Sequence, residues 1–589
     1  MKLLQAVRAA LSSQNGAALP LVFVALLLVS VLGFTLWTLG VTEVSIATNW
    51  RSYSSAFYGA QAGIESGLTD LKTILAGNPT PPPATLAGIA PRALDPTLGL
   101  NFANFSVTQV TPLPFQTTFA TGPYTGLSGV ATNYQIVSQV TGLGGTRANL
   151  TQVVQYVQIP LFQFGVFYGQ GVDLEIAPGP DMTFNGRVHA NSNIYVGAGA
   201  TLQFQSNMTT AGNIYRHIKR DSAIPWGNNP QIADAGGILR TLNFDHDYQL
   251  GFGSTWASAN DWKSQALSTF GGKVQDSTMG VQPIIPPVPD LFYNPSNPDV
   301  ASHQMIEPPK SSDSPELTSA KLYTQANIRI VDGVATDKNG NPVSLPAGLI
   351  TTTSFYDARE GKTMQVTQVD VSKAGSVPAL TNGGVLYVAS SGLASACGNP
   401  CPAVRLVNGA TLPSKGLSVV SQNPVYVQGD YNTTKNGPVD PATGLQTHPP
   451  AAVLADAITV LSNNWKPNNS DTKGNQDTSS RLATATTVNA AFATGPSAES
   501  APNQGNGQLE NDIRFLEDWT GQKLAYRGSI IDLWHSMQAT AAWRCCGSGA
   551  GQYYSPPIRD WGYDTLFSSS PPPGTPRGIL IIKGPWSQS

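Results

Sequence analysis

The sequence predicts an α+β protein that is mainly β: a long N-terminal helix followed by a β-rich domain that forms an irregular parallel β-helix with insertions. Two observations support this fold class. A long uncharged apolar run lies near the N-terminus, and short apolar strands separated by Gly and Asn recur downstream. The 589 residues also include 58 Gly and 45 Pro, a composition typical of turn-rich β proteins. A β-sandwich is the rival architecture.

The first predicted element is a transmembrane helix over residues 17–77. No Asp, Glu, Lys or Arg occurs between Arg8 and Glu43, and the apolar part exceeds the roughly 20 residues that a helix needs to cross a bilayer. Lys2 and Arg8 precede the run, so the positive-inside rule keeps the N-terminus in the cytoplasm and exports the remainder. The Pro-rich segment 77–83 ends the helix.

Pro20 predicts where this helix begins. Inside a helix that starts at Met1, Pro20 would cost about 3 kcal/mol. Cleavage after Gly16 would place it in the first turn, where the amides lack helical partners and the cost largely disappears. The sequence therefore favours a leader over residues 1–16 and a mature chain that begins at Ala17.

Two stretches of this segment resemble a known family. Gly16-Ala-Ala-Leu19 before the apolar helix resembles the class III signal of type IV pilin-like proteins. Phe57-Tyr-Gly-Ala-Gln-Ala-Gly-Ile-Glu65 resembles the Phe-Tyr-Ala-Ala-Glu-Ala-Gly-Ile-Glu signature of PilX-type minor pilins, from which Gly59 and Gln61 depart. The resemblance covers residues 1–75. The candidate transmembrane and assembly residues are Leu19, Pro20, Leu21, Glu43, Phe57, Tyr58, Ala60, Gly63 and Glu65.

The resemblance implies a processing route and a set of partners. It implies cleavage by a prepilin peptidase between Gly16 and Ala17, N-methylation of Ala17, and assembly with other pilins and minor pilins through the helix. The protein would first be a single-pass inner-membrane protein with its bulk in the periplasm, and later extracellular in the pilus.

Leu21 stands where major pilins carry a glutamate. A carboxylate buried among apolar helices needs a partner charge, and in pilins the N-terminal amine of a neighbouring subunit supplies it. Leu21 cannot form that pair, which suits the filament tip or an initiation complex better than the shaft. PilX-type minor pilins usually lack this glutamate as well. Leu21 therefore supports minor-pilin status but does not distinguish a position at the filament tip from one in the shaft.

The remaining chain divides into a linker, a small sheet and a large domain. Residues 78–101 are rich in Pro and Ala and predict a linker. Residues 102–164 predict a small antiparallel sheet, because segments 133–140 and 148–157 alternate between apolar and polar residues. Residues 165–589 predict the β-rich exported domain.

Within that domain the sequence predicts several interruptions. An insertion is expected at about 221–370, with a helix at 260–269 and a hairpin at 355–371. The polar span 468–506 predicts a flexible loop. The tail segments 553–564 and 571–576 are expected to lie extended over the domain as a cap.

The four cysteines form two close pairs, Cys397 with Cys401 and Cys545 with Cys546. Export would place them in an oxidising compartment, where disulfides persist. A bridge that closes the 397–401 loop is favoured, while a cross-link between the two pairs stays open. A metal site is a weaker alternative, because the spacing does not match zinc ribbons and no His lies close.

The sequence provides few candidates for catalysis or metal binding. Asp245 and Asp247 flank His246, but in a strand they would share a face that His246 does not, so a solvated loop is favoured. Asp337-Lys-Asn-Gly-Asn341 resembles part of a calcium loop without its downstream Glu, and Asn339-Gly340 predicts a hairpin turn. His189 is expected to be structural, and no hydrolase, phosphate-loop or zinc-protease motif is present.

Aromatic residues offer one further candidate site. They could line a sugar-binding groove, although packing in the core or cap is favoured. These residues are Trp519, Trp534, Trp543 and Trp561.

Two functional classes follow from these patterns. The favoured class is a non-catalytic minor pilin or pilus assembly component whose β-rich domain serves tip priming or adhesion, for which a surface polysaccharide or host ligand is a conceivable partner. The alternative is a membrane-anchored β-helix protein that binds or cleaves polysaccharide. The net charge of -3 and the charged fraction of 12% argue against nucleic acid, because no basic cluster would neutralise phosphates. No cofactor or catalytic residue is predicted.

Overall fold

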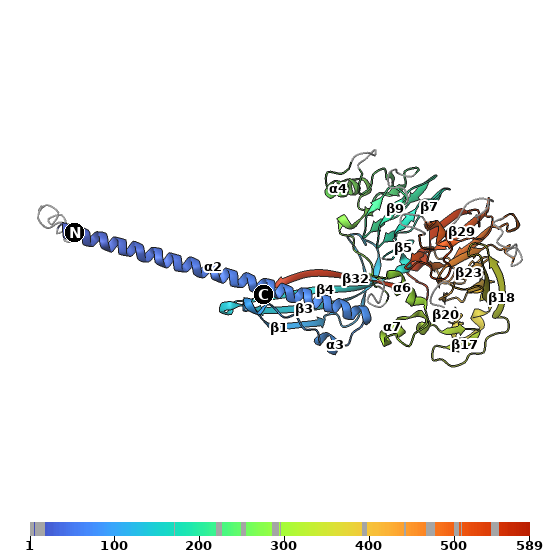
Figure 1. Cartoon of the computed structure of the whole chain (residues 1–589), viewed down its shortest axis with the longest axis horizontal. Helices are drawn as coiled ribbons and strands as arrows, with labels where there is room; N and C mark the ends of the chain where they lie inside the picture. The colour runs from blue at the N-terminus through green and yellow to red at the C-terminus, as the bar shows by residue number, and fades with distance from the viewer. Residues whose placement is uncertain are drawn as a thin grey trace.

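A computed structural model shows a long helix that carries a β-rich mass at one end (Figure 1). The coarse α+β layout predicted from the sequence is therefore confirmed. The structure describes Gln5 and residues 18–169, 171–219, 227–248, 255–285, 292, 294, 296–391, 397–440, 443–466, 478–499, 506–507, 509–543 and 553–589.

The helix α2 runs over Ala18–Gly77. Its first half is exposed along its whole length, whereas its second half buries one stripe against a sheet. The buried residues of this stripe are three or four positions apart, which places them on one face of the helix. Its buried apolar members are Ala56, Ala60, Ile64, Leu68, Leu71 and Leu75.

The sheet under α2 has five antiparallel strands, ordered β1-β3-β4-β32 with β2 also paired to β3. We call this sheet and the second half of α2 the head, residues 51–160 and 577–589, and residues 161–576 the body. The strands are β1 (Asn101–Gln109), β2 (Phe115–Thr118), β3 (Ser128–Thr141), β4 (Arg147–Pro160) and β32 (Arg577–Gln588).

The last strand of the chain follows the segments predicted as a cap. Residues 577–588 form β32, which pairs antiparallel with β4 in the head. Upstream of it, β31 (Ile558–Tyr563) pairs in parallel with β29. The tail therefore supplies strands to two sheets.

Small residues allow α2 to approach the sheet closely. A Cβ placed on Gly63 would lie 2.7 Å from Phe102 and also collide with Ser138, and one on Gly67 would lie 2.7 Å from Phe105. Close backbone approach at such positions excludes larger side chains. The expected linker 78–101 also contributes, since α3 (Pro83–Ala87) buries Leu86 in the head.

The first part of the body consists of very short strands in parallel sheets. Ile194 pairs in register with Leu174 on one side and Ile214 on the other, each twenty residues away. The strands rotate among three sheets in chain order. They are β5 (Val166–Tyr168), β6 (Leu174–Ile176), β7 (Met182–Phe184), β8 (Val188–Ala190), β9 (Ile194–Val196), β10 (Leu202–Phe204), β11 (Met208–Thr210) and β12 (Ile214–Tyr215).

The last part of the body repeats this parallel arrangement. Val419 of one strand pairs with Val453 of the next in the same sheet, and the alternate strands form a second ladder. The strands are β20 (Gly384–Ala389), β21 (Cys401–Val407), β22 (Leu417–Ser421), β23 (Val425–Gln428), β24 (Ala451–Ala455), β25 (Ile458–Leu461), β26 (Thr486–Asn489), β27 (Ala491–Ala493), β28 (Ile513–Arg514), β29 (Lys523–Gly528) and β30 (Ile530–Asp532).

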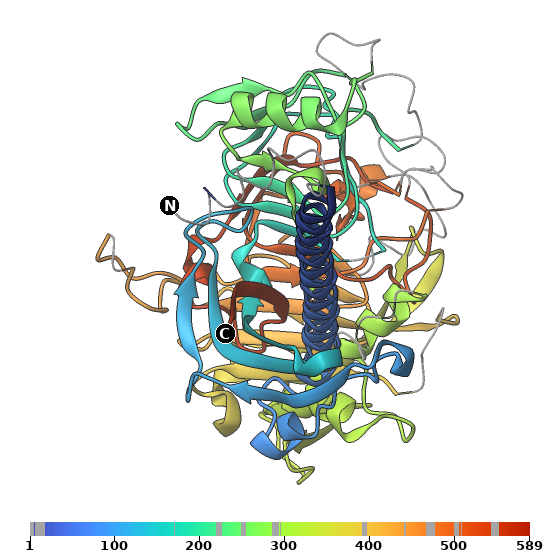
Figure 2. The same ribbon diagram turned by 90° about the vertical axis from the view of Figure 1, so that its left-hand side faces the viewer.

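The two parts of the body join through β30 and β5. Ile530 pairs in parallel with Val166, so one sheet of eleven strands runs through the whole body. Figure 2 shows the resulting order: green strands at one end, red and orange strands in the middle, yellow strands at the other end. Side chains from the stacked strands fill the interior between the sheets.

The range 221–370, expected as an insertion, contributes strands to these same sheets. β13 (Gln231–Ala233) and β15 (Val274–Gln275) extend the first part, and β16 (Ile328–Val331) begins the second. The expected helix is α4 (Ala259–Phe270), and the expected hairpin is β18 (Ile350–Asp357) with β19 (Lys362–Asp370). The other elements are β14 (Leu239–Thr241), α6 (Pro298–His303), α7 (Pro315–Ala320), α8 (Leu322–Gln325) and β17 (Val334–Asp337).

The span 468–506, expected as a flexible loop, includes β26 and β27, whose apolar side chains are buried. Residues 467–477 and 500–505 lie outside the described part of the chain. Short 3-10 helices lie between the other elements. They are Pro96–Leu98, Leu143–Gly145, Leu161–Gln163, Ser277–Met279, Gln304–Ile306, Val371–Ser376, Pro378–Leu380, Thr478–Ser480, Leu509–Asn511 and Thr565–Ser568.

The packing of α2 on the head sheet yields a stability prediction. Ala60 is fully buried in this interface, whereas Ala62 is exposed on the same helix. We expect Ala60→Leu to destabilise the head by about 1–3 kcal/mol through overpacking, and Ala62→Leu to leave it unchanged. Unfolding midpoints of the detergent-solubilised chain would measure both, and equal midpoints for the two variants would contradict the proposed packing.

Candidate assembly interface

The exposed half of α2 is the largest uncovered apolar surface on the described residues. From Ala18 to Trp50 nearly every residue is exposed, including Leu19 and Leu21. The segment is long and apolar enough to cross a membrane. Apolar surface of this extent is not stable in water, so the helix is a candidate membrane anchor or signal sequence.

The residues of segment 57–65 contact different parts of the head sheet. Ala60 and Gly63 are buried on the sheet, and Tyr58 is exposed. Phe57 and Glu65 contact the C-terminal strand β32 of the same sheet. The signature therefore contributes to the head's own packing.

Three contacts join β32 to α2. Lys583 Nζ lies 2.7 Å from Glu65 Oε1, and the ring of Trp586 lies 6.0 Å from that of Phe57. Gln588 Nε2 also donates to the hydroxyl of Tyr53. The ion pair is half exposed, so water screens it and it adds little stability by itself.

Sequence reasoning missed Lys583, Trp586 and Gln588. The apolar run 579–582 before them predicts a strand, but no local pattern shows which sheet that strand joins. Its partner β4 lies far from it in the sequence, in the N-terminal third of the chain.

The predicted processing residues Gly16 and Ala17 lie outside the described part of the chain. The described part of α2 runs from Ala18 and includes Pro20. Leu21 is exposed there, and so is Glu43 further along the helix.

Cys397 and Cys401 form the predicted loop-closing disulfide. Their sulfur atoms are 2.00 Å apart, and both side chains are buried. Lys362 Nζ donates to the Cys397 carbonyl at 2.7 Å and ties the loop to β19. The second predicted pair, Cys545 and Cys546, lies outside the described residues.

The candidate metal cluster around His246 is a set of turn contacts. Asp245 is buried and accepts hydrogen bonds from the backbone amides of Arg216, Asp247 and Tyr248. His246 Nδ1 instead lies 3.0 Å from Asp276. The three residues therefore do not converge on one point.

The other candidate polar residues also have structural partners. Asp337 Oδ1 accepts from the amides of Asn339 and Asn341, which is the geometry of the predicted turn. His189 is fully buried between Thr209 and Asn191, and burial lowers the pKa of its imidazole to about 4. Within the described ranges no three His, Cys, Asp or Glu side chains are placed to hold a metal ion.

The tryptophans do not form an exposed groove. Trp519 and Trp534 are fully buried, and Trp561 nearly so. Trp543 packs at the edge of the body core, where its Nε1 donates to Tyr554. Packing, the favoured alternative for these side chains, matches their positions.

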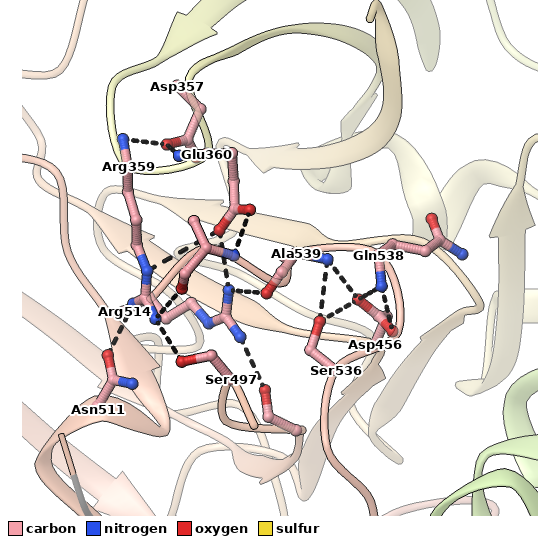
Figure 3. Close-up of polar contacts among 12 residues, drawn as sticks. Asp357, Arg359, Glu360, Asp456, Ser497, Asn511, Arg514, Ser536, Gln538 and Ala539 are labelled. Carbon is pink, nitrogen blue, oxygen red and sulfur yellow. Dashed lines mark hydrogen bonds and ion pairs between the residues drawn. The ribbon is translucent and has the colours of Figure 1, made fainter. Parts of the chain in front are cut away.

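Figure 3 shows a buried polar network between the β18–β19 turn and other segments of the body. Arg359 donates to Asn511 Oδ1 at 2.7 Å and to Ser497 Oγ at 3.2 Å. Arg514 of β28 lies 3.2 Å from Glu360 Oε1. Removing one partner would leave a buried charge uncompensated, which is strongly destabilising, so this network anchors the hairpin.

Asp456 holds a neighbouring loop in the same region (Figure 3). It accepts from Ser536 Oγ at 2.5 Å and from the amides of Met537 and Ala539. His303 Nε2 lies 3.1 Å from Asp456 Oδ1. Burial disfavours protonation of His303, but hydrogen bonds to Asp456 and Glu307 outweigh it and raise its pKa to about 9.

Three further carboxyl groups lie inside the body near the β5–β30 junction. Asp512 accepts from the Tyr168 hydroxyl at 2.6 Å, and Tyr168 is in register with Asp532 across the two strands. Burial raises the pKa of Asp512, of Asp532 and of Glu510, in the last case to about 7. Both Asp532 oxygens and Glu510 Oε1 find no hydrogen-bond partner among the described residues.

Comparisons with protein-family models, curated proteins and solved structures gave no match for this chain. Its interpretation therefore rests on the geometry above and on the sequence.

The buried Glu510 predicts a pH dependence of stability. Its folded pKa of about 7 exceeds the ordinary 4.5 because of burial. The folded state thus holds the proton more tightly, and stability falls as pH rises from 4.5 through 7. We expect Glu510→Gln to remove this loss, worth up to about 3 kcal/mol at pH 8 and little at pH 4.

Glu517 provides the matched control. Burial also raises the pKa of this carboxyl to about 7, but it accepts two hydrogen bonds of 2.6 Å from Ser462. Because that pKa already includes these bonds, Glu517→Gln should show the same favourable trend between pH 4 and pH 8. The weakened bonds to Ser462 should make it destabilising at pH 4, where Glu510→Gln has little effect. Chemical denaturation at pH 4 and pH 8 would test the pair, and a Glu510→Gln effect that is the same at both values would exclude the proposed titration.

Proposed function

We propose that this protein is a non-catalytic, pilin-like assembly component that is anchored and assembled through α2 and displays the body for tip priming or adhesion. The observation that carries the proposal is the division of α2 into two halves. One half is buried on an antiparallel sheet, and the other is an uncovered apolar rod. Such a rod requires a bilayer or a bundle of similar helices around it.

The proposal includes a location and partners. The chain crosses the inner membrane once, with its N-terminus in the cytoplasm and the head and body in the periplasm, and it is later extracellular in the pilus. Prepilin peptidase acts on it at Gly16, and other pilins and minor pilins contact its helix. Leu21, with no charge to pair with an N-terminal amine, supports minor-pilin status.

We further propose that the body is an irregular parallel β-helix. The twenty-residue spacing between in-register residues of successive strands supports this architecture. Each strand of two or three residues is too short to bury a face alone and depends on its neighbours. The side chains stacked inside the sheets provide the hydrophobic core.

The alternative, a polysaccharide-binding or polysaccharide-cleaving β-helix, would be favoured by a groove with clustered exposed carboxylates on the stacked strands. The carboxyl groups that gather inside the body, Asp456, Glu510, Asp512 and Asp532, are buried. Trp519, Trp534 and Trp561 are buried as well. These positions favour the assembly component, with polysaccharide or a host molecule as a ligand that the body would bind.

Replacing Gly16 tests the proposed processing. We expect Gly16→Val to leave residues 1–16 attached when the chain is expressed with a prepilin peptidase, because a branched side chain does not fit a site that accepts Gly. Intact-mass measurement distinguishes the two products.

Gly40→Val provides the control for this substitution. Gly40 lies on the exposed face of α2 with no atom near its Cβ position, so the same replacement there should leave cleavage intact. Equal masses for the Gly16→Val variant and the parent would overturn the processing step.

A further inference from the structure

Four large apolar side chains are exposed together at one end of the head. We call them the head rim. They come from four separate segments of the chain: α2, the turn before β1, the β3–β4 turn and the end of β32. The exposed fractions are 70% for Trp50, 51% for Leu98, 66% for Leu143 and 57% for Trp586.

Contacts between these segments hold the rim in place. Ser52 Oγ donates to the Leu143 carbonyl at 2.5 Å and lies 2.7 Å from Thr146 Oγ1, which ties the β3–β4 turn to α2. A Cβ placed on Gly99 would lie 2.6 Å from the Leu143 side chain, so the turn before β1 also lies close to Leu143. The ring centroids of Trp50 and Tyr53 are 6.2 Å apart, and the Tyr53 hydroxyl accepts a hydrogen bond from Gln588 of β32.

The rim lies on the side of the head from which the apolar half of α2 emerges. Figure 1 shows the C-terminus and the β3–β4 turn at this end. Trp50 follows Val41, the last residue of the apolar run, by nine residues, or about 14 Å at 1.5 Å per residue. Any apolar medium that surrounds the run therefore ends close to the rim.

The composition of the rim fits the surface of a bilayer. Tryptophan is enriched where hydrocarbon meets water, because one part of its ring system is apolar and the other donates a hydrogen bond. Arg51 and Arg147 are exposed beside the rim, and such groups attract anionic headgroups. Glu43 and Asp95 are also exposed near this end, so the apolar side chains supply the main attraction.

The length of the apolar run favours a tilt that lowers the rim. Leu19 to Val41 spans about 34 Å as a helix, whereas the hydrocarbon core is about 30 Å thick. A longer span can be accommodated by tilting. Tilting towards the side that carries the sheet brings the rim down to the headgroups.

We infer that the head rim docks on the anionic bilayer surface before assembly and orients the body above the membrane. This inference rests on the proposed membrane anchoring of α2. A neighbouring pilin-like subunit is the other conceivable occupant. The bilayer is favoured because the rim is continuous with the apolar rod that the membrane would surround.

Photo-cross-linking in nanodiscs of phosphatidylethanolamine and phosphatidylglycerol tests the docking. Benzoylphenylalanine would replace Leu143 in the full chain, or Leu113 as the control. Leu113 is 76% exposed and belongs to the loop between β1 and β2, away from the rim. We expect at least about fivefold more lipid adduct from position 143 than from position 113, because only the former would reach the interface.

A third probe position, in place of Leu28 in the apolar run, separates this inference from the anchoring itself. Lipid adducts at position 28 with equal, low yields at 143 and 113 would overturn the docking and leave the anchoring standing. No lipid adduct at position 28 would overturn both. A protein adduct in place of the lipid adduct at position 143 would assign the rim to a second subunit and overturn the docking.

Discussion

The pairing of β32 with β4 is the constraint on which the arrangement of head and body depends. The ladder runs from Pro160 opposite Arg577 to Leu150 opposite Gln588. The chain enters the body after β4 and returns to the head at the start of β32. Because these two strands are paired, the two crossings lie side by side. Two adjacent connections restrain the orientation of the body more than one linker could.

Elements that produce a short repeating pattern of apolar residues could be predicted from the sequence. Pairings between strands that are distant in the sequence could not. The apolar run, the helix up to Gly77 and the head hairpin all follow from local spacing, and the structure contains each of them. The partner of β32 and the β5–β30 junction carry no local signal. Strands with one apolar side pair equally well with many others, and only the complete fold selects among them.

The candidate site shows the same division. Ala60 and Gly63 could be placed on a packed face because small residues at helical spacing indicate close approach. The contacts of Phe57 and Glu65 with β32 required the tertiary structure, since Trp586 and Lys583 are remote in sequence. The buried carboxyl groups near β30 escaped notice because isolated acidic residues in a polar sequence look like surface groups.

The chain order of the eleven-stranded sheet has a consequence for biogenesis. Val166 is among the first residues of the body in chain order, yet its partner Ile530 comes near the end of the body. If the chain is exported as proposed, β5 has an open edge while the chain emerges, and β4 in the head remains unpaired with β32 for even longer. Unprotected edges invite wrong pairing with other chains. Under that proposal, the edges of β4 and β5 would need protection until almost the entire chain has emerged.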